Sequence, residues 1–126
     1  MRFVQMNSVE QQAAQLGVKI TTHIARAEDF DWGNAQWDLI VISYVGGREF
    51  VTNVLRSLRP GGMLLVEGFH RDATKTQPIG GAVVFDTNEL LKLYTGLRVI
   101  RYEDTEAVAD FGLQKVRVVR LFAQKP

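Results

Sequence analysis

Apolar residues along the chain form short continuous runs separated by a stripe with helical spacing. Leu39–Ser43 (LIVIS) and Met63–Glu67 (MLLVE) are continuous runs, which are typical of strands covered on both faces of a sheet. Between them, the apolar residues of Glu49–Leu58 share one stripe and predict a helix. The Pro-Gly-Gly segment at 60–62 ends that helix, because proline lacks an N–H and glycine lets the chain reverse. Strands alternating with helices favour an α/β layered domain with a mostly parallel sheet.

The N-terminal part of the pattern predicts a strand on either side of a helix. Arg2–Gln5 is short and extended in character. Ser8 and Gln11 have the spacing of a capping box, so a helix is expected to begin at Ser8 and to stop at Gly17. Val18–Ala25 (VKITTHIA) is rich in β-branched residues and predicts a strand.

The C-terminal part predicts one further helix and two strands. A helix capped by Asp86 or Thr87 is expected to run through Tyr94, and Asp86 and Glu89 have the spacing of a capping box. Leu97–Glu103 and Lys115–Gln124 are strand candidates joined by an acidic connection. We expect these two strands to form an antiparallel pair, which completes a single domain over the whole chain.

Composition and charge exclude several classes of function. The 126 residues include 15 basic and 14 acidic side chains, a net charge of +1, which gives no electrostatic reason to expect nucleic acid or an anionic membrane as partner. No window approaches the ~20 apolar residues of a membrane span, and the start has no apolar core of a signal peptide, so a cytoplasmic protein is expected. There is no cysteine, and the two histidines lie far apart, so no metal site is expected.

Three segments, taken in order, resemble the class I S-adenosylmethionine-dependent methyltransferases. They are WDLIVISYV (Trp37–Val45), LRPGGMLLVEGF (Leu58–Phe69), and the closing pair FDTNELLKLYTGLRVIRYED with KVRVVRLFAQKP (Phe85–Asp104 and Lys115–Pro126). The last pair is similar to the end of small bacterial methyltransferases of the TehB-like type. The resemblance implies a three-layer Rossmann-like sheet, mostly parallel with a C-terminal antiparallel hairpin, and methyl transfer from S-adenosylmethionine to a small-molecule substrate.

The chain departs from the family at the start of the cofactor site. Family members carry a Gly-x-Gly-x-Gly loop after their first strand, and no such loop occurs here. The acidic residue that holds the ribose hydroxyls would fall at Gln5, Met6 or Asn7, of which Asn7 is the cofactor-binding candidate. Each lost hydrogen bond costs ~1 kcal/mol or more, so the resemblance predicts weak cofactor binding and leaves open whether this chain is active alone. Compared with family members, the sequence looks like a methyltransferase that begins about one third of the way along the domain.

The same departure predicts an exposed sheet edge. In the family's sheet, the first strand lies between the second and the fourth, and the fourth corresponds to Leu39–Ser43. Without that neighbour the apolar strand has an unpaired edge, which proteins usually cover or pair. Either Arg2–Gln5 or Val18–Ala25 takes the place, or a second copy does, so we expect a homodimer or a strand-exchanged oligomer.

Two regions supply candidate site residues. By resemblance, Ala27, Glu28 and Asp29 fall where family members contact adenine; the alternative is a solvated acidic turn. Ligands of open α/β sheets sit outside the carboxyl ends of the strands, and Ser43 and Tyr44 lie at one such end. By resemblance, both would line the methyl-transfer site and contact the cofactor, and Tyr44 is also a catalytic candidate.

The second strand end supplies His70 and Glu67. His70 has an ordinary pKa near neutrality and is a candidate catalytic base, although an exposed histidine beside a polar loop has the same sequence signature. Glu67 ends an apolar strand and needs a partner if it is buried; Arg71, Lys75 and Arg101 are the candidates.

Two further features leave alternatives open. Arg71–Lys75 lies in a long stretch without a clear period, and it is either a lid over the substrate or a solvated loop. Trp32 and Trp37 flank a turn and are expected to be packing anchors. The alternative function is a non-catalytic methyltransferase-like domain that serves as an oligomerisation or binding module, and a third possibility is another nucleotide-binding α/β fold.

Overall fold

The chain consists of two compact units in a computed structural model that describes residues 3–108 and 114–126. The units are Met1–Asp31 and Trp32–Pro126. The first unit contains helix α1 (Phe3–Gln15) and the 3-10 turn η1 (Ala27–Asp29). The extended conformation expected for Arg2–Gln5 is wrong over its described residues, because the helix expected from Ser8 begins at Phe3.

Val18–Ala25 is not a strand, contrary to the expectation from its β-branched residues. The segment is irregular in the structure, and Val18, Ile20 and Ile24 are all exposed. A strand forms only when its N–H and C=O groups meet a neighbouring backbone, and no described strand pairs with this segment. The predicted stop at Gly17 is confirmed, since Gly17 has a φ of 71° and the Val18 amide donates to the Ala13 carbonyl at 3.0 Å.

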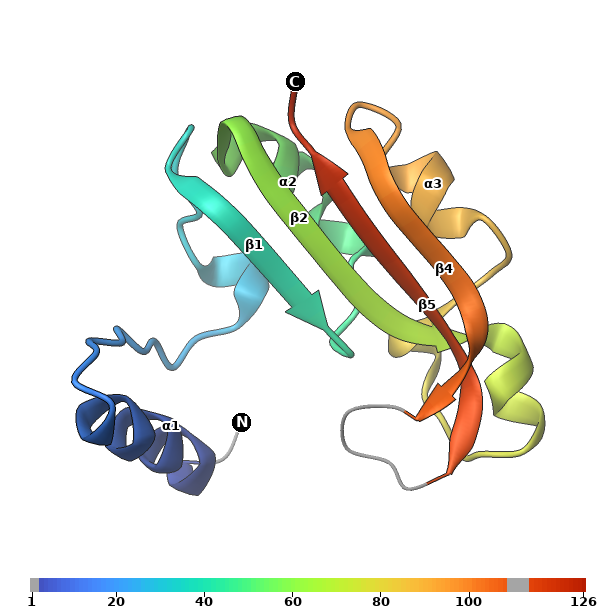
Figure 1. The fold of residues 1–126 in the computed structure, drawn as a ribbon, viewed down its shortest axis with the longest axis horizontal. Coiled ribbons are helices and arrows are strands. Elements are labelled where there is room, and N and C mark those ends of the chain that lie inside the picture. Colours follow the sequence, from blue (N-terminus) through green and yellow to red (C-terminus); the bar gives the residue numbers. More distant parts are fainter. Residues whose placement is uncertain (1–2, 109–113) are drawn as a thin grey trace. The chain divides into compact units, whose positions relative to one another are not determined.

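The second unit is built on a mixed five-stranded sheet (Figure 1). Its strands are β1 (Trp37–Ser43), β2 (Leu58–His70), β3 (Val84–Phe85), β4 (Arg98–Val108) and β5 (Lys115–Gln124). The order is β1-β2-β5-β4, with the short β3 beside the end of β2. β1 runs parallel to β2, while β5 is antiparallel to both β2 and β4. The parallel pair and the C-terminal antiparallel hairpin predicted from the sequence are therefore confirmed.

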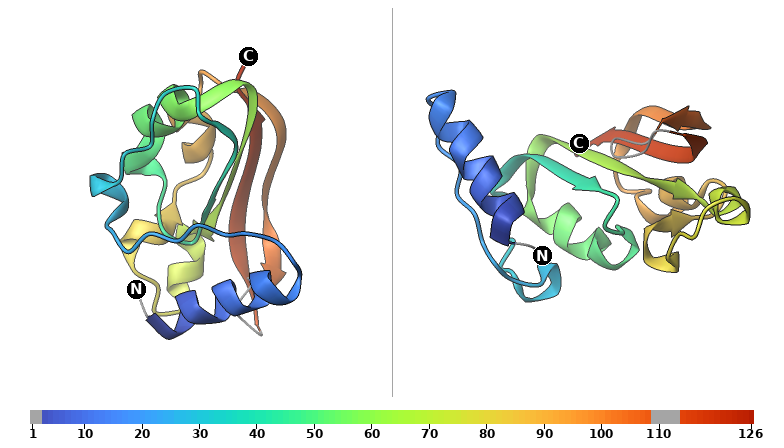
Figure 2. Two further views of the ribbon diagram at one scale, coloured as in Figure 1. Left: turned by 90° about the vertical axis from the view of Figure 1, so that its left-hand side faces the viewer. Right: turned by 90° about the horizontal axis from the view of Figure 1, so that it is seen from below.

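The helices of this unit lie on one face of the sheet (Figures 1 and 2). They are η2 (Arg48–Phe50), α2 (Val51–Ser57) and α3 (Glu89–Leu93). The main core lies between them and the sheet; its largest fully buried side chains are Tyr94, Phe85, Leu58, Leu64, Leu90 and Leu121. Trp32 packs on this core as expected, with its ring centroid 5.5 Å from that of Phe50. No helix in the described part of the chain is long and apolar enough to cross a membrane.

The Pro-Gly-Gly segment at 60–62 lies in the first residues of β2, after α2 has ended at Ser57. Gly61 has a φ of 83°, and a Cβ on Gly62 would lie 2.8 Å from the Arg59 carbonyl oxygen and 3.0 Å from that of Trp37. Only glycine therefore fits the close approach of these backbones. β2 is longer than the predicted Met63–Glu67, because pairing with β1 and β5 extends it beyond the apolar run.

The long stretch after β2 is ordered by two short 3-10 turns, η3 (Arg71–Lys75) and η4 (Gly81–Val83). Ala73 of η3 is 2% exposed and packs in a second core cluster with Phe69 and Val118. The interpretation of these residues as a solvated loop is therefore wrong for its centre, because one apolar side chain anchors η3 against the sheet.

Candidate functional site

The carboxyl ends of the parallel strands β1 and β2 meet at one edge of the sheet. Ser43 lies opposite Glu67 in the register, and the Tyr44 amide donates to the Glu67 carbonyl at 2.8 Å. The expected position of Ser43 and Tyr44 at a strand end is confirmed. Ligands of open α/β sheets bind outside such an edge, so these residues define the candidate site.

The turn after β1 has an unusual backbone. Tyr44, Gly46 and Gly47 have φ values of 55°, 117° and 146°. The left-handed region is uncommon for a residue with a side chain, and such residues cluster at functional sites. Gly47 is buried, and a Cβ there would lie 3.4 Å from a Val66 methyl carbon. The strand end is therefore held in a conformation that few residues adopt.

The Tyr94 side chain holds this turn in place with a hydrogen bond. Its hydroxyl donates to the Gly47 carbonyl oxygen at 2.7 Å, and the side chain is 1% exposed. Burial raises the pKa of the Tyr94 hydroxyl, with a smaller contribution from the charge of Glu49. The hydroxyl thus stays protonated and keeps its role as donor.

Glu67 is paired across the sheet with Arg120, not with any of the predicted partners. The Arg120 Nε donates to Glu67 Oε2 at 2.6 Å, and the glutamate side chain is 14% exposed. The register explains the pair, because Glu67 and Arg120 lie directly opposite each other on β2 and β5. The predicted partners form other ion pairs: Arg71 with Asp86, Lys75 with Asp72 at 3.3 Å, and Arg101 with Glu103 at 3.3 Å.

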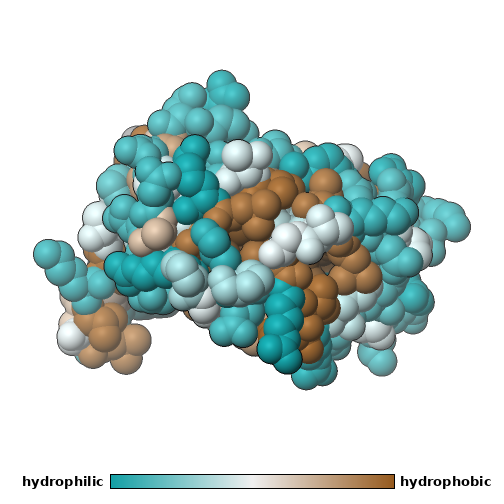
Figure 3. Space-filling model, turned by 90° about the horizontal axis from the view of Figure 1, so that it is seen from above, coloured by the Kyte–Doolittle hydropathy of each residue, from teal (hydrophilic) through white to brown (hydrophobic). Residues whose placement is uncertain are grey.

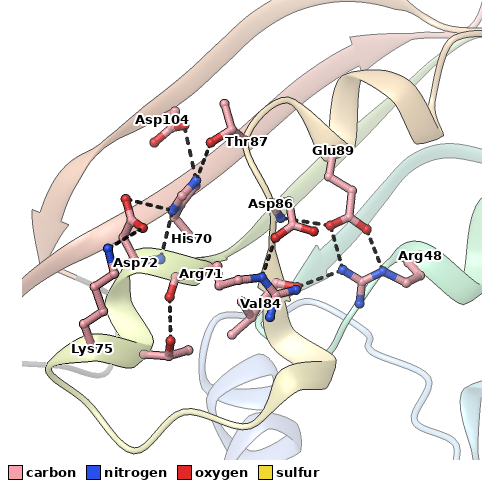
Figure 4. A network of polar contacts seen from close by, with 11 residues as sticks. Arg48, His70, Arg71, Asp72, Lys75, Val84, Asp86, Thr87, Glu89 and Asp104 are labelled. Atoms are coloured by element: carbon pink, nitrogen blue, oxygen red, sulfur yellow. Dashed lines mark hydrogen bonds and ion pairs between the residues drawn. The ribbon is translucent and has the colours of Figure 1, made fainter.

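His70 lies at the end of β2 with both ring nitrogens engaged (Figure 4). Its Nδ1 accepts from the Asp72 amide at 3.0 Å, and its Nε2 lies 2.8 Å from the Thr87 hydroxyl oxygen. An Nδ1 that accepts carries no proton, so the neutral ring holds its proton on Nε2. The side chain is buried, with Asp104 3.9 Å from Nε2. The geometry therefore favours a positioning role for the imidazole, which caps η3.

A network of hydrogen bonds around Arg48 joins the turn after β1 to α3 (Figure 4). Arg48 donates from Nε and Nη2 to the two carboxylate oxygens of Glu89 at 2.6 and 2.8 Å, and from Nη2 to the Val84 carbonyl at 2.9 Å. The hydrogen bond from Arg48 lowers the pKa of Glu89 and raises that of the arginine. Glu89 also accepts from the Asp86 amide at 2.9 Å. The predicted helix start at Asp86 or Thr87 is wrong, because α3 begins at Glu89 with Asn88 as its N-cap.

The remaining predicted site residues lie in the first unit. Asn7 is part of α1, and Ala27, Glu28 and Asp29 form η1, where all three are exposed. Ser43, Tyr44 and His70 belong to the second unit. The cofactor roles of Asn7, Ala27, Glu28 and Asp29 stay a prediction.

Sequence reasoning missed Arg120, Arg48 and Tyr94. Arg120 interrupts the apolar run of Lys115–Gln124, but its place opposite Glu67 depends on the register of β2 and β5. The Gly46-Gly47 pair shortly after an apolar run was a usable signal, since it indicates a turn with positive φ. Arg48 and Tyr94 carry no local signal, because their partners are distant in the sequence. No group of three or more potential metal ligands occurs in the part of the chain that the structure describes.

Comparison with solved structures identifies the fold. TehB from Haemophilus influenzae superimposes with a TM-score of 0.77 at 16% identity, covering 99% of this chain and 48% of that chain. A SAM-dependent methyltransferase from Methanosarcina mazei gives 0.69 at 17% identity, covering 98% and 78%. The N-methyltransferase NodS from Bradyrhizobium japonicum gives 0.60 at 18% identity, covering 99% and 70%.

No family model matches the chain, and no curated protein matches it. The likeness at these identities is one of architecture. The chain spans about half the length of TehB. Over that span it has the α/β fold of the class I S-adenosylmethionine-dependent methyltransferases.

Proposed function

We propose that the chain takes part in methyl transfer from S-adenosylmethionine to a small molecule. The turn after β1 carries the proposal. It combines a tyrosine with positive φ, two buried glycines and the Tyr94 hydrogen bond at the strand edge where this fold binds ligands. Structural neighbours that are SAM-dependent methyltransferases support the cofactor class.

The groups at this edge suit a polar ligand. Ser43 is exposed at the end of β1, and Tyr44 follows it directly. Glu67 lies in register with Ser43, but its carboxylate is paired with Arg120 and its Oε1 is buried. Ser43 and Tyr44 are therefore the residues of this unit that would hold the cofactor. When bound, S-adenosylmethionine supplies an electrophilic methyl group on a sulfonium.

The protein's part in such a reaction is orientation. Methyl transfer depends mainly on holding an acceptor in line with the methyl group. Tyr44 is held by its backbone and by ring contact with Phe69, whose centroid lies 4.9 Å away. His70 keeps η3 in place beside β2 through its Nδ1. We assign Tyr44 to the lining of the site and His70 to positioning.

Calorimetric titration with S-adenosylmethionine tests the proposal. Binding in the micromolar range, abolished in Ser43→Arg and retained in Thr95→Arg, supports it. Thr95 is a matched control because it is exposed and precedes β4, which begins across β5 from Met63, near the other end of β2 from Glu67. No heat at millimolar ligand, with the chain folded by circular dichroism, overturns cofactor binding by this chain.

The alternative function is a non-catalytic oligomerisation or binding module. One observation favours it: β1 has β2 as its single neighbour among the described strands, and Leu39 and Val41 are each 54% exposed. A chain that binds no S-adenosylmethionine but associates in solution supports this alternative. Sedimentation equilibrium on the sample used for calorimetry separates the two functions.

A further inference from the structure

His70 is a titratable side chain that is buried in the fold. Among the described residues, the buried polar or charged side chains are Ser57 and His70, and His70 is 6% exposed. Hydrophilic residues otherwise cover much of the surface, as Figure 3 shows for one face. Histidine is the side chain that ordinarily changes its charge between about pH 5 and pH 8. A change of charge at His70 therefore acts on buried groups and not on water.

The neutral ring caps η3. Its Nδ1 accepts from the Asp72 amide at 3.0 Å, and its Nε2, which carries the proton, lies 2.8 Å from the Thr87 hydroxyl oxygen. Figure 4 shows the ring between these two partners. His70 is thus the N-cap residue of η3, and its side chain satisfies an amide that the first turn leaves without a backbone acceptor.

Protonation of the ring reverses the role of Nδ1. An imidazolium has an N–H at both nitrogens and accepts at neither. The Asp72 amide would then face a second donor, and its hydrogen bond would be lost. An acceptor for the new N–H is the carboxylate of the same residue, whose Oδ2 lies 3.5 Å from Nδ1. Asp72 must turn to exchange its amide for its carboxylate, so the start of η3 has two arrangements.

The charged groups around the ring come from η3, β4, β5 and the residues after β3. They are three carboxylates, each with a cation as partner: Asp72 with Lys75, Asp104 with Arg117, and Asp86 with Arg71. Asp104 lies 3.9 Å from Nε2. The pKa of Asp86 is lowered by its hydrogen bond from Arg71 and, to a smaller extent, by the charge of His70. Carboxylates ordinarily stay ionised above about pH 5, so the ring is the group of this cluster that changes its charge above that pH.

We propose that His70 is a pH-sensitive cap of η3. The neutral ring holds the start of η3 beside the end of β2, and the imidazolium releases it. Ala73 of η3 is buried in one cluster with Phe69, and Tyr44 packs against that cluster. The released segment therefore adjoins the candidate site, whereas the turn after β1 keeps its own hydrogen bond from Tyr94. The inference concerns η3 itself and does not depend on methyl transfer.

An NMR titration of the whole chain from about pH 8 to pH 5, the range over which histidine ordinarily titrates, tests the cap. The chemical shifts of the ring nitrogens report where the proton lies, and we expect Nδ1 of His70 to carry none at the start. As the ring gains its second proton, the protection factor of the Asp72 amide against hydrogen exchange should fall about fivefold or more, because an N-cap hydrogen bond is lost. A proton on Nδ1 at the start, a ring that stays neutral throughout, or an amide that does not follow the ring overturns the proposal.

Two substitutions separate the charge of this ring from other effects of pH. His70→Asn keeps an acceptor oxygen on an N-cap side chain that does not titrate, so the protection of the Asp72 amide should no longer depend on pH. His23, the other histidine of the chain, is exposed and lies in the first unit. His23→Gln is therefore the matched control and should retain the fall seen in the parent chain.

Circular dichroism checks that each variant is folded. A fall in protection that persists in His70→Asn, or that disappears in His23→Gln, contradicts the cap. If His70→Asn does not fold, the titration of the parent chain and of His23→Gln decides the question, because both follow the ring of His70 directly.

Discussion

β1 and β4 are the two outer strands of one sheet, and they are held by different means. β1 buries Ile40 and Ile42 against the helices, at 9% and 4% exposure. β4 has no buried residue along its eleven positions; it pairs with β5 from Arg98 to Val108. One outer strand is anchored by apolar burial and the other by its backbone ladder and its charges.

The two outer strands also differ in their number of charged side chains. β1 carries one charged side chain, whereas β4 carries five: Arg98, Arg101, Glu103, Asp104 and Glu106. Charges that must stay hydrated prevent a strand from joining another sheet. The comparison teaches that β4 is an edge built to remain an edge, while β1 has the composition of an interior strand.

The largest expected difference between the two strands lies in their apolar contacts. Ile42→Ala should lower the free energy of unfolding by about 2–4 kcal/mol, because it leaves a cavity beside the core. Val99→Ala should change it by less than about 0.5 kcal/mol, since Val99 is exposed. Urea unfolding followed by circular dichroism measures both values. Equal losses would remove the distinction between the strands.

The ion pair of Glu67 and Arg120, on the inner strands β2 and β5, provides an intermediate case. Arg120→Ala leaves the carboxylate of Glu67 without its partner and should cost about 2 kcal/mol. Glu67→Gln/Arg120→Met removes both charges and should recover most of that loss. A double variant as unstable as Arg120→Ala would show that the loss comes from packing of the arginine stem and not from the charge.

Acid should weaken the Arg48–Glu89 ion pair, which joins the turn after β1 to α3. The pKa of Glu89 is lowered by its hydrogen bond from Arg48, so the stability it contributes is present above the pKa of the unfolded chain. That stability, of order 1 kcal/mol, is lost as pH falls through the folded pKa. Glu89→Gln should flatten the acid side of the stability profile between about pH 5 and pH 3. An unchanged profile would assign the acid sensitivity to other carboxylates.

The smallest expected effects compare one ion pair on each outer strand. Asp38 on β1 is paired with Arg59 at 3.0 Å, with side chains 82% and 52% exposed. Asp104 on β4 is paired with Arg117 at 2.7 Å and is 18% exposed. Asp38→Asn should change stability by less than about 0.5 kcal/mol, and Asp104→Asn should cost more. Thermal unfolding at low and high salt checks the order, and a reversed order would contradict it.

The sequence predicted those parts of the fold whose signals are local. Leu39–Ser43 and Met63–Glu67 lie within β1 and β2 because continuous apolar runs of this length rarely do anything else. The antiparallel C-terminal pair followed from two strand candidates without a helix between them. Val18–Ala25 failed because β-propensity describes a side chain's fit to a sheet and does not supply the neighbouring strand.

The place of Ser43 and Tyr44 at a strand end was predicted, but the detail around them was not. Their expected role follows from the family resemblance and from the rule that ligands bind at the carboxyl ends of strands. The positive φ of Tyr44 has no sequence signal of its own, because it depends on the two glycines that follow and on Tyr94. Arg120 was missed as the partner of Glu67 because the pairing depends on the register of β2 and β5, which propensity does not determine.

The hydrogen bond from Tyr94 to Gly47 has one more consequence. Acid breaks ion pairs by protonating carboxylates, but a phenol whose pKa is raised by burial is indifferent to acid and to moderate base. A hydrogen bond between uncharged groups therefore holds the turn that carries Tyr44. The conformation of this turn should persist over a pH range in which the neighbouring carboxylates change their charge.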